Sequence, residues 1–274
     1  GNRYWVVVGW AAGLHLPHSP RRPADHHPVA VAARKTPRRS SIPWRAAGAI
    51  IPGANMPAEI WVGQFSIVAG EAREESPWTG LFPPRAGLGV HLYVLVEPAG
   101  AGSAEVCQPL AATIGRLFQQ QHLSLTGGLL SALRGAHQQL RDWNQKSLRQ
   151  HWVGAGATCL ALRGSEAYLA QAGPSLAYCR QGDRLTAVAP PGPPACQPIG
   201  TAEEFYPHFS RYPVASGDAA LLASSSLASA VGEDVVAGLL SLPPRDILPE
   251  LYLRVRHLEQ FAALLVAFLP SEAP

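Results

Sequence analysis

The spacing of the apolar residues changes between residues 143 and 158 of this chain, and that change limits the folds available to it. Between residues 106 and 143 apolar side chains recur at helical spacing, which predicts a pair of helices over 104–120 and 128–147. From residue 158 to residue 189 the spacing becomes that of short strands separated by turns that contain glycine. Blocks of helices and blocks of strands, without strict alternation, are typical of the α+β class.

Other runs of residues complete this layout. β-branched and aromatic runs precede the helix pair, and an apolar run lies near the end of the chain. The short turns from 158 to 189 predict an antiparallel meander, so we expect a layered α+β domain with a largely antiparallel sheet. The expected strands are 60–69, 88–96, 158–163, 167–171, 175–180, 185–189, 219–224 and 261–269, and the further helices are 226–241 and 246–257.

The charged residues divide the chain into two parts. Residues 1–58 carry a net charge of +7, whereas residues 59–274 carry a net charge of −4. The first part is rich in Pro, Arg and His and has no sustained apolar period, so we expect it to be mostly disordered and residues 1–55 to be dispensable for folding. Met56 is the only methionine. Two interpretations of the first part are left open. Either the native chain begins at Met56 and the residues before it are extra translated sequence, or the first part is a genuine basic tail.

The composition excludes several classes of protein. Hydrophobic residues make up 47% of the chain and charged residues 15%, which is too little charge for a wholly disordered protein or a coiled coil. No run reaches the roughly 18 to 20 apolar residues of a membrane span, and the basic part lacks interleaved aromatic residues, so neither a membrane nor a nucleic acid is expected as a partner. Four scattered cysteines without a Cys-x-x-Cys pair favour a reduced, cytoplasmic setting.

Six segments of the second part carry short motifs in a recognisable order. One of them, Gly70–Trp78, is similar to Gly-x-x-Arg-x-x-Asn-Glu-Asp. The segments are 70–78, 93–100, 156–162, 170–186, 216–227 and 259–267. In order and spacing they resemble the metal-dependent serine/threonine protein phosphatases of type 2C. The resemblance covers roughly residues 60–269 and implies that family's fold, a layered α-β-β-α sandwich of two mainly antiparallel sheets flanked by helices.

The resemblance also implies where a metal centre would lie. In that family aspartates hold a pair of Mg²⁺ or Mn²⁺ ions, whose bound water attacks the phosphate. The matching positions here keep only two carboxylates; they are Trp78, Glu97, Pro174, Ser225 and Glu259. Two carboxylates do not neutralise two divalent cations, so we expect the metal site to be lost and no metal cofactor to be bound. Glu97 and Glu259 could together hold one cation weakly, or be hydrogen-bonded or solvated carboxylates.

Two other residues are singled out by the resemblance. Arg73 matches the arginine with which the family contacts the substrate phosphate, which implies a phosphate-binding role. An exposed arginine in an acidic run with Glu71, Glu74 and Glu75 is the alternative. Asp218 matches a position in the tight turn before a strand, so its expected role is structural.

The motifs and the missing carboxylates together predict a function. We expect a catalytically inactive phosphatase-like domain, a pseudophosphatase, that acts as a regulatory or phosphoprotein-binding module with a protein or phosphoprotein partner. A divergent metal-dependent serine/threonine phosphatase with weak residual activity is the alternative. Enzymes of unrelated chemistry find no support, because the sequence has no Gly-x-Ser-x-Gly, P-loop or His-Glu-x-x-His motif. The sequence does not indicate which partner is bound or the oligomeric state.

Overall fold

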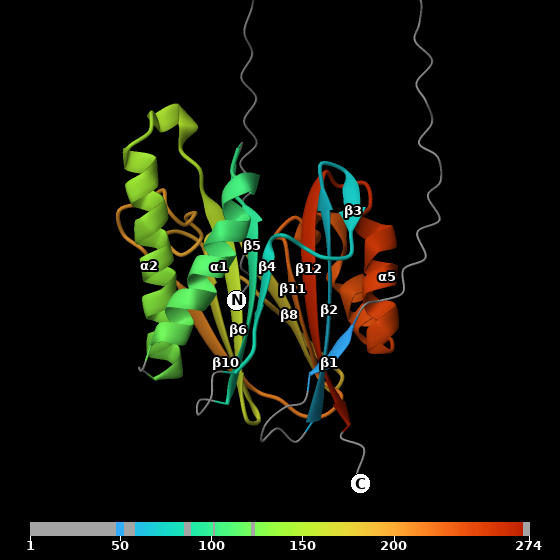
Figure 1. Ribbon diagram of the computed structural model, residues 1–274. Helices are drawn as coiled ribbons and strands as arrows, with labels where there is room; N and C mark the ends of the chain where they lie inside the picture. Colours follow the sequence, from blue (N-terminus) through green and yellow to red (C-terminus); the bar gives the residue numbers. More distant parts are fainter. Residues whose placement is uncertain (1–47, 52–57, 85–88, 101, 122–123, 271–274) are drawn as a thin grey trace, which may run out of the picture. The chain divides into compact units, whose positions relative to one another are not determined.

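Two antiparallel β-sheets pack face to face, and helices cover the outer side of each sheet (Figure 1). The computed structural model describes residues 48–51, 58–84, 89–100, 102–121 and 124–270, all within one compact unit of the chain. This arrangement is the α-β-β-α sandwich that the family resemblance implies.

The larger sheet has seven strands in the order β1-β2-β12-β11-β8-β9, with β3 paired to the end of β2. Its longest pairing, between β2 and β12, is in antiparallel register from Ala58 opposite Pro270 to Val68 opposite Gln260. The strands are β1 (Ala49–Ile51), β2 (Ala58–Val68), β3 (Glu71–Arg73), β8 (Leu176–Gln181), β9 (Arg184–Val188), β11 (Ala219–Ala223) and β12 (Gln260–Pro270).

The smaller sheet has five strands in the order β10-β7-β6-β5-β4, again all antiparallel. Its β5–β6 pair places Glu97 opposite Gly156 at one end and Val90 opposite Arg163 at the other. The strands are β4 (Thr79–Phe82), β5 (Val90–Pro98), β6 (Ala155–Arg163), β7 (Glu166–Ala172) and β10 (His208–Pro213).

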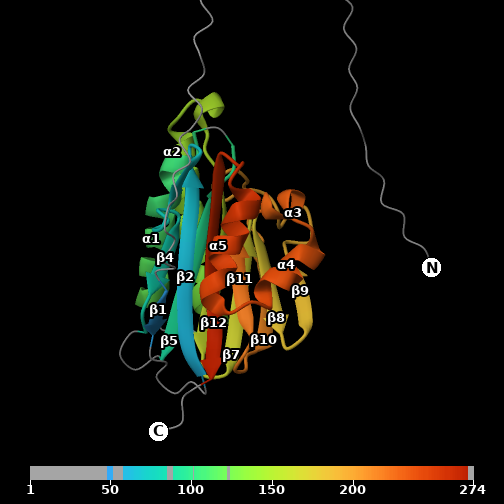
Figure 2. The same ribbon diagram turned by 90° about the vertical axis from the view of Figure 1, so that its right-hand side faces the viewer.

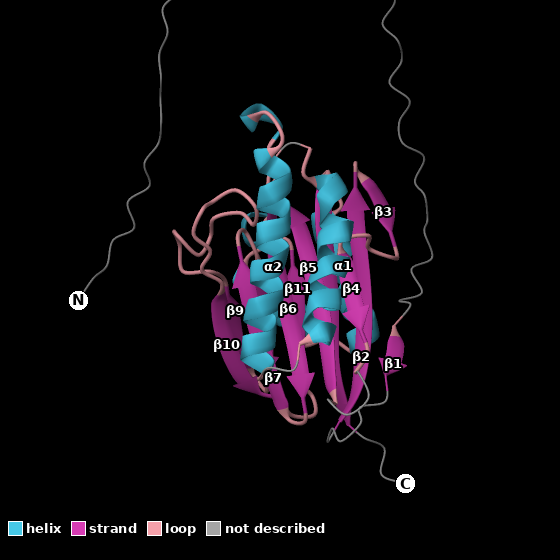
Figure 3. Cartoon of the chain, turned by 60° about the vertical axis from the view of Figure 1, so that its left-hand side comes forward, coloured by secondary structure: helices cyan, strands magenta, loops and turns pink. Residues whose placement is uncertain are grey.

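The helices form two groups. The predicted pair, α1 and α2, lies side by side over the five-stranded sheet (Figure 3), and α2 starts three residues earlier than expected. The helices α3, α4 and α5 lie over the seven-stranded sheet (Figure 2). The elements are α1 (Ala104–Gln120), α2 (Leu125–Gln145), the 3-10 turn η1 (Arg149–His151), α3 (Leu227–Ala230), α4 (Glu233–Leu240) and α5 (Pro244–Val255).

Strand alternation divides the core into layers. Successive side chains of a strand point to opposite faces, so a strand between two packed layers must be apolar on both. In β12, Leu264 and Val266 belong to the buried cluster shared with the five-stranded sheet, whereas Phe261 and Leu265 pack with the helical side. This explains why the C-terminal run is continuously apolar.

The predicted antiparallel meander over residues 158–189 is wrong. These strands form two hairpins, β6–β7 in the five-stranded sheet and β8–β9 in the seven-stranded sheet, and the chain crosses between the sheets at 173–175. Gly173 makes the crossing possible, because its φ of +68° is favourable only for glycine and a Cβ there would lie 2.8 Å from the carbonyl oxygen of Ala155. A three-residue connection between sheets looks like a hairpin turn in the sequence.

Two further expectations differ from the structure. The single helix expected over 226–241 is two helices, because Val231 adopts an extended conformation and Gly232 starts α4. The strand β1 lies within residues 1–58, which we expected to be mostly disordered. Residues 1–47 and 52–57 lie outside the described residues, so for them that expectation stays a prediction.

Candidate functional site

The Glu97 carboxylate connects the two sheets at one end of the sandwich. Glu97 lies near the end of β5 and is only 5% exposed. Its Oε2 atom accepts a hydrogen bond of 2.8 Å from the backbone N–H of Ser225, which follows β11 in the other sheet. Burial raises the pKa of Glu97 to about 7, and the bond from Ser225 only partly opposes this shift. Glu97 is therefore a buried carboxyl group that titrates near neutral pH.

Pro174 lies in the segment that crosses between the sheets, and it contacts the strand β6 beside Glu97. Gly156 is opposite Glu97 in the sheet register. A Cβ atom built on Gly156 would lie 1.5 Å from the carbonyl oxygen of Pro174 and 3.2 Å from Cγ of Glu97. The structure therefore brings together three of the five positions that the resemblance singled out: Glu97, Pro174 and Ser225.

The other two positions differ in burial. Trp78 lies just before β4, its side chain is 2% exposed, and its carbonyl oxygen accepts a 2.8 Å hydrogen bond from the N–H of Val96, next to Glu97. Glu259 lies just before β12, and its carbonyl oxygen accepts a 2.9 Å bond from the N–H of Gly70. The Glu259 side chain is exposed, and its carboxylate has no hydrogen-bond or ion-pair partner among the described residues.

Arg73 ends β3, opposite Ser66 of β2 in the register. Its side chain is exposed, and over the part of the chain that the structure describes it forms no ion pair with Glu71, Glu74 or Glu75. A guanidinium group without an ion-pair partner keeps its N–H donors available for a ligand.

Polar side chains that the sequence analysis did not single out lie in the layer between the sheets. Gln171 is fully buried and donates a 2.9 Å hydrogen bond from Nε2 to the carbonyl oxygen of Val188, across the two sheets. Thr79 makes a second link by donating from Oγ1 to Oε1 of Gln64. The sequence signal that could have revealed such links is a polar residue inside an apolar strand, such as Gln171 or Thr158. These links show that the interior beside Glu97 is partly polar.

Two other groups have structural roles. The thiol of Cys107 is fully buried, and its pKa is raised to about 12 by burial first and by the charge of Glu97 second. This thiol is therefore protonated and unreactive at neutral pH. Asp218 accepts hydrogen bonds from the N–H groups of Gly182, at 3.0 Å, and Ala215, at 2.9 Å. The structural role expected for Asp218 in its turn is confirmed.

The side chains of the described residues offer no grouped set of metal ligands. Within the described ranges, no three His, Cys, Asp or Glu residues are grouped so that they could hold a metal ion. In the same ranges, no helix has the length and apolar character needed to cross a membrane.

The fold is that of the type 2C serine/threonine phosphatases, as the sequence resemblance implied. No protein-family model and no curated protein matches the sequence. Among solved structures, PppA, described as a key regulatory component of T6SS in Pseudomonas aeruginosa, aligns with a TM-score of 0.58 at 18% identity, over 77% of this chain and 98% of that one. The serine/threonine phosphatase Stp1 of Staphylococcus aureus aligns with a TM-score of 0.63 at 16% identity, over 81% of this chain and 100% of that one.

A third similar structure contains metal ions. The catalytic domain of the serine/threonine protein phosphatase PstP, in complex with two manganese ions, aligns with a TM-score of 0.58 at 16% identity. The alignment covers 77% of this chain and 99% of that one. At this level of identity the similarity establishes the fold, and function must be argued from the side chains.

Proposed function

We propose that this chain is a catalytically inactive phosphatase-like domain that acts by binding a protein partner, with phosphoproteins as the favoured class. One observation carries the proposal. Of the five positions that correspond to metal-binding aspartates, only Glu97 and Glu259 have carboxylates, and Oε2 of Glu97 already accepts the hydrogen bond from Ser225. The carboxylate of Glu259 is exposed instead of buried beside it.

The residues present do not fit a pair of divalent cations. Mg²⁺ and Mn²⁺ prefer several oxygen ligands, and two adjacent cations need carboxylates to offset their mutual repulsion. Trp78 supplies a buried indole in place of a carboxylate, and Ser225 directs a backbone N–H, the positive end of a dipole, toward Glu97. A cation at Glu97 would also compete with a proton near pH 7. These residues therefore do not support a metal-dependent hydrolytic step.

The binding role is supported by a different group. Arg73 is exposed and is not engaged in an ion pair among the described residues, so its guanidinium can contact a phosphoryl group through two parallel N–H donors. Among the similar structures, PppA is described as a regulatory component. We propose a regulatory role for this chain as well, exerted through binding and not through hydrolysis.

The test uses the full chain in two assays. Calorimetric titration with millimolar Mn²⁺ should show no binding, and hydrolysis of a phosphoserine peptide should stay at background. The same peptide should bind, and Arg73→Ala should weaken its binding by the roughly 1.5 to 3 kcal/mol of a charge-assisted hydrogen bond, about tenfold or more. The matched control, Arg184→Ala, removes an exposed arginine from β9 of the same sheet and should leave the affinity unchanged.

Two outcomes would contradict parts of this proposal. Manganese-dependent turnover that disappears in Glu97→Ala would establish the alternative, a divergent metal-dependent phosphatase. Phosphopeptide binding that is the same in Arg73→Ala would show that Arg73 has no part in recognition.

A further inference from the structure

A second charged region lies at the opposite end of the five-stranded sheet from Glu97. Gly156, opposite Glu97, is near the start of β6, whereas Arg163 is the last residue of that strand. There a pocket of about 400 Å³ opens between the start of α2 and strands β6, β7 and β10. Leu125, Tyr168 and Phe209 give it apolar walls, and Arg163 and Arg211 stand at its edge.

The two arginines are arranged around one aromatic ring. The guanidinium carbon of Arg163 lies 6.0 Å from the centre of the Tyr168 ring, and that of Arg211 lies 5.5 Å from it. Tyr168 is buried, so its ring is a fixed platform for both cations. Two guanidinium groups from different strands are therefore held at the same pocket.

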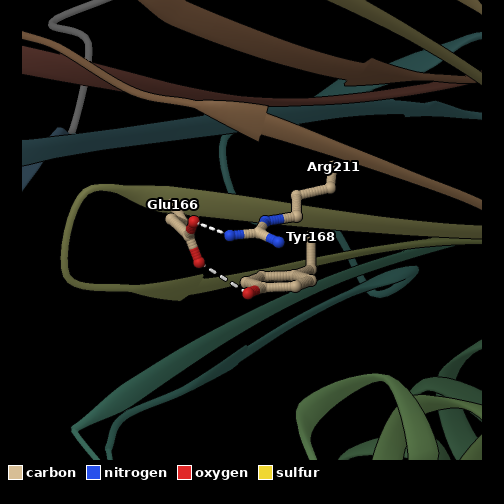
Figure 4. Close-up of polar contacts among 3 residues, drawn as sticks. All are labelled: Glu166, Tyr168 and Arg211. Atoms are coloured by element: carbon tan, nitrogen blue, oxygen red, sulfur yellow. Dashed lines mark hydrogen bonds and ion pairs between the residues drawn. The ribbon is translucent and has the colours of Figure 1, made fainter.

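Glu166 fixes one of these arginines without neutralising both. Its Oε1 accepts a hydrogen bond from Nη2 of Arg211, and its Oε2 accepts a 2.6 Å bond from the Tyr168 hydroxyl (Figure 4). These bonds, that of Tyr168 first, lower the pKa of Glu166, so it stays ionised at neutral pH. Arg163 has no ion-pair partner among the residues described. Glu166 lies opposite Arg163 in the β6–β7 register and its charge acts on that arginine too, so the two arginines and Glu166 together carry one net positive charge.

The neighbouring backbone adds to this positive potential. The 21-residue helix α2 begins at the pocket, with Ser124 as its N-cap and Leu125 and Thr126 in its first turn. The N-terminal end of a helix carries a partial positive charge from its unpaired N–H groups. The pocket therefore combines two guanidinium groups, a helix N-terminus and apolar walls.

We propose that this pocket binds a small phosphomonoester with an apolar body. The planar donors of Arg163 and Arg211 suit the oxygens of a phosphoryl group, and the side chains of Leu125 and Phe209 suit an aromatic or aliphatic body. The pocket volume of about 400 Å³ lies within the range typical of sites that bind small molecules. The site does not include Arg73 or Glu97, so the inference stands independently of the proposed function.

Phenyl phosphate is the probe for the test, titrated into the full chain by calorimetry at about 0.15 M ionic strength, where the Debye length is about 8 Å. We expect saturable binding of one molecule per chain, and weaker binding of inorganic phosphate, which lacks the apolar body. Arg163→Gln and Arg211→Gln should each weaken phenyl phosphate binding about tenfold or more. Arg163→Lys, which keeps the charge but loses the planar donors, should give a smaller loss.

The controls separate this site from general charge effects. Arg184→Gln removes an equal charge from the other sheet and should leave the affinity within about twofold, because exposed distant charges are screened. Absence of saturable binding, equal affinity in Arg163→Gln, or an equal loss in Arg184→Gln would each overturn the proposal. Arg163 is exposed, so its substitution tests binding without threatening the fold.

Discussion

The Cα atom of Gly156 lies against the carbonyl oxygen of Pro174, so closely that a Cβ atom on Gly156 would lie 1.5 Å from that oxygen. The contact joins β6 of the five-stranded sheet to the segment that crosses into the seven-stranded sheet. Because the neighbouring atom belongs to the backbone, it cannot move away as the end of a flexible side chain can. Only glycine fits at this position beside Glu97.

Gly156→Ala should therefore destabilise the protein. Forcing a methyl group into a packed position costs about 1 to 3 kcal/mol, and here the value should reach the upper end. Urea denaturation measures the change. The control is Gly238→Ala in helix α4, where a Cβ meets nothing within 4 Å, and alanine should stabilise by about 0.5 to 1 kcal/mol. A Gly156→Ala protein as stable as the parent would contradict the described contact.

Stability should depend on pH through Glu97. Its pKa is raised from 4.5 to about 7 in the folded chain, so the folded state binds a proton that the unfolded state has released. The free energy of unfolding should then fall as the pH rises from about 4.5 to 7, by about 3 kcal/mol, and level off above that range. Glu97→Gln, which keeps the acceptor for Ser225, should be more stable than the parent at pH 8 and similar at pH 5.

The measurement for Glu97 is urea denaturation of both proteins at the two pH values. Glu75→Gln, at an exposed loop position, should track the parent at both. A difference between Glu97→Gln and the parent that does not change with pH would show that Glu97 is not a buried, titrating carboxyl group.

Asn144 should be one of the most sensitive polar positions in the chain. It is fully buried on α2, and its Nδ2 donates to the carbonyl oxygens of Val153, at 2.8 Å, and Gly200, at 2.9 Å. Its Oδ1 accepts from the Val153 N–H at 3.0 Å. Asn144→Ala leaves three buried backbone groups without partners, and each costs about 1 to 3 kcal/mol.

The expected loss for Asn144→Ala is therefore about 3 kcal/mol or more in chemical denaturation. Its neighbour Gln145 is exposed, so Gln145→Ala should change the stability by less than about 0.5 kcal/mol. Equal effects of the two substitutions would mean that helix propensity, and not the polar contacts, decides stability at this end of α2.

Truncations of the N-terminal part test the domain boundary. Deleting residues 1–47 should leave the melting temperature within about 2 °C, because that segment has no periodic apolar face to bury. Deleting residues 1–57 also removes β1, which pairs with β2, and Gly48, whose backbone lies against the Trp61 ring. A loss on the order of 1 kcal/mol should lower the melting temperature by about 2 to 4 °C. A large loss in the shorter deletion would move the boundary toward the N-terminus.

The sequence predicts the long, strongly periodic elements well. The helix pair and the apolar strands β2, β5, β11 and β12 are where the residue pattern placed them, because burial on one or both faces dictates their composition. The strands β1, β3 and β4 were missed because they have only three or four residues, and β10 was missed because it is partly exposed along its length and lacks a clear alternation. The pairing of β8 with β11 instead of β7 depends on long-range packing, which the local pattern does not contain.

The candidate site was predictable only in part. The motif resemblance located Glu97, Pro174 and Ser225, which the structure brings together. It did not reveal that Glu97 bonds to the Ser225 backbone, because that contact joins residues 128 positions apart. Nor did it indicate the pocket at Arg163 and Arg211, since arginines on separate strands become neighbours only through the β6–β7–β10 pairing.

The pairing of β2 with β12 has a consequence for how the chain is made. Strand β2 is synthesised well before β12, its full-length partner in the seven-stranded sheet. Until then β2 and β11, which flank β12 in the finished sheet, present unpaired edges to the surroundings. Unpaired strand edges of this kind favour aggregation. A stop codon ahead of residue 260 would leave β2 and β11 without the strand that joins them.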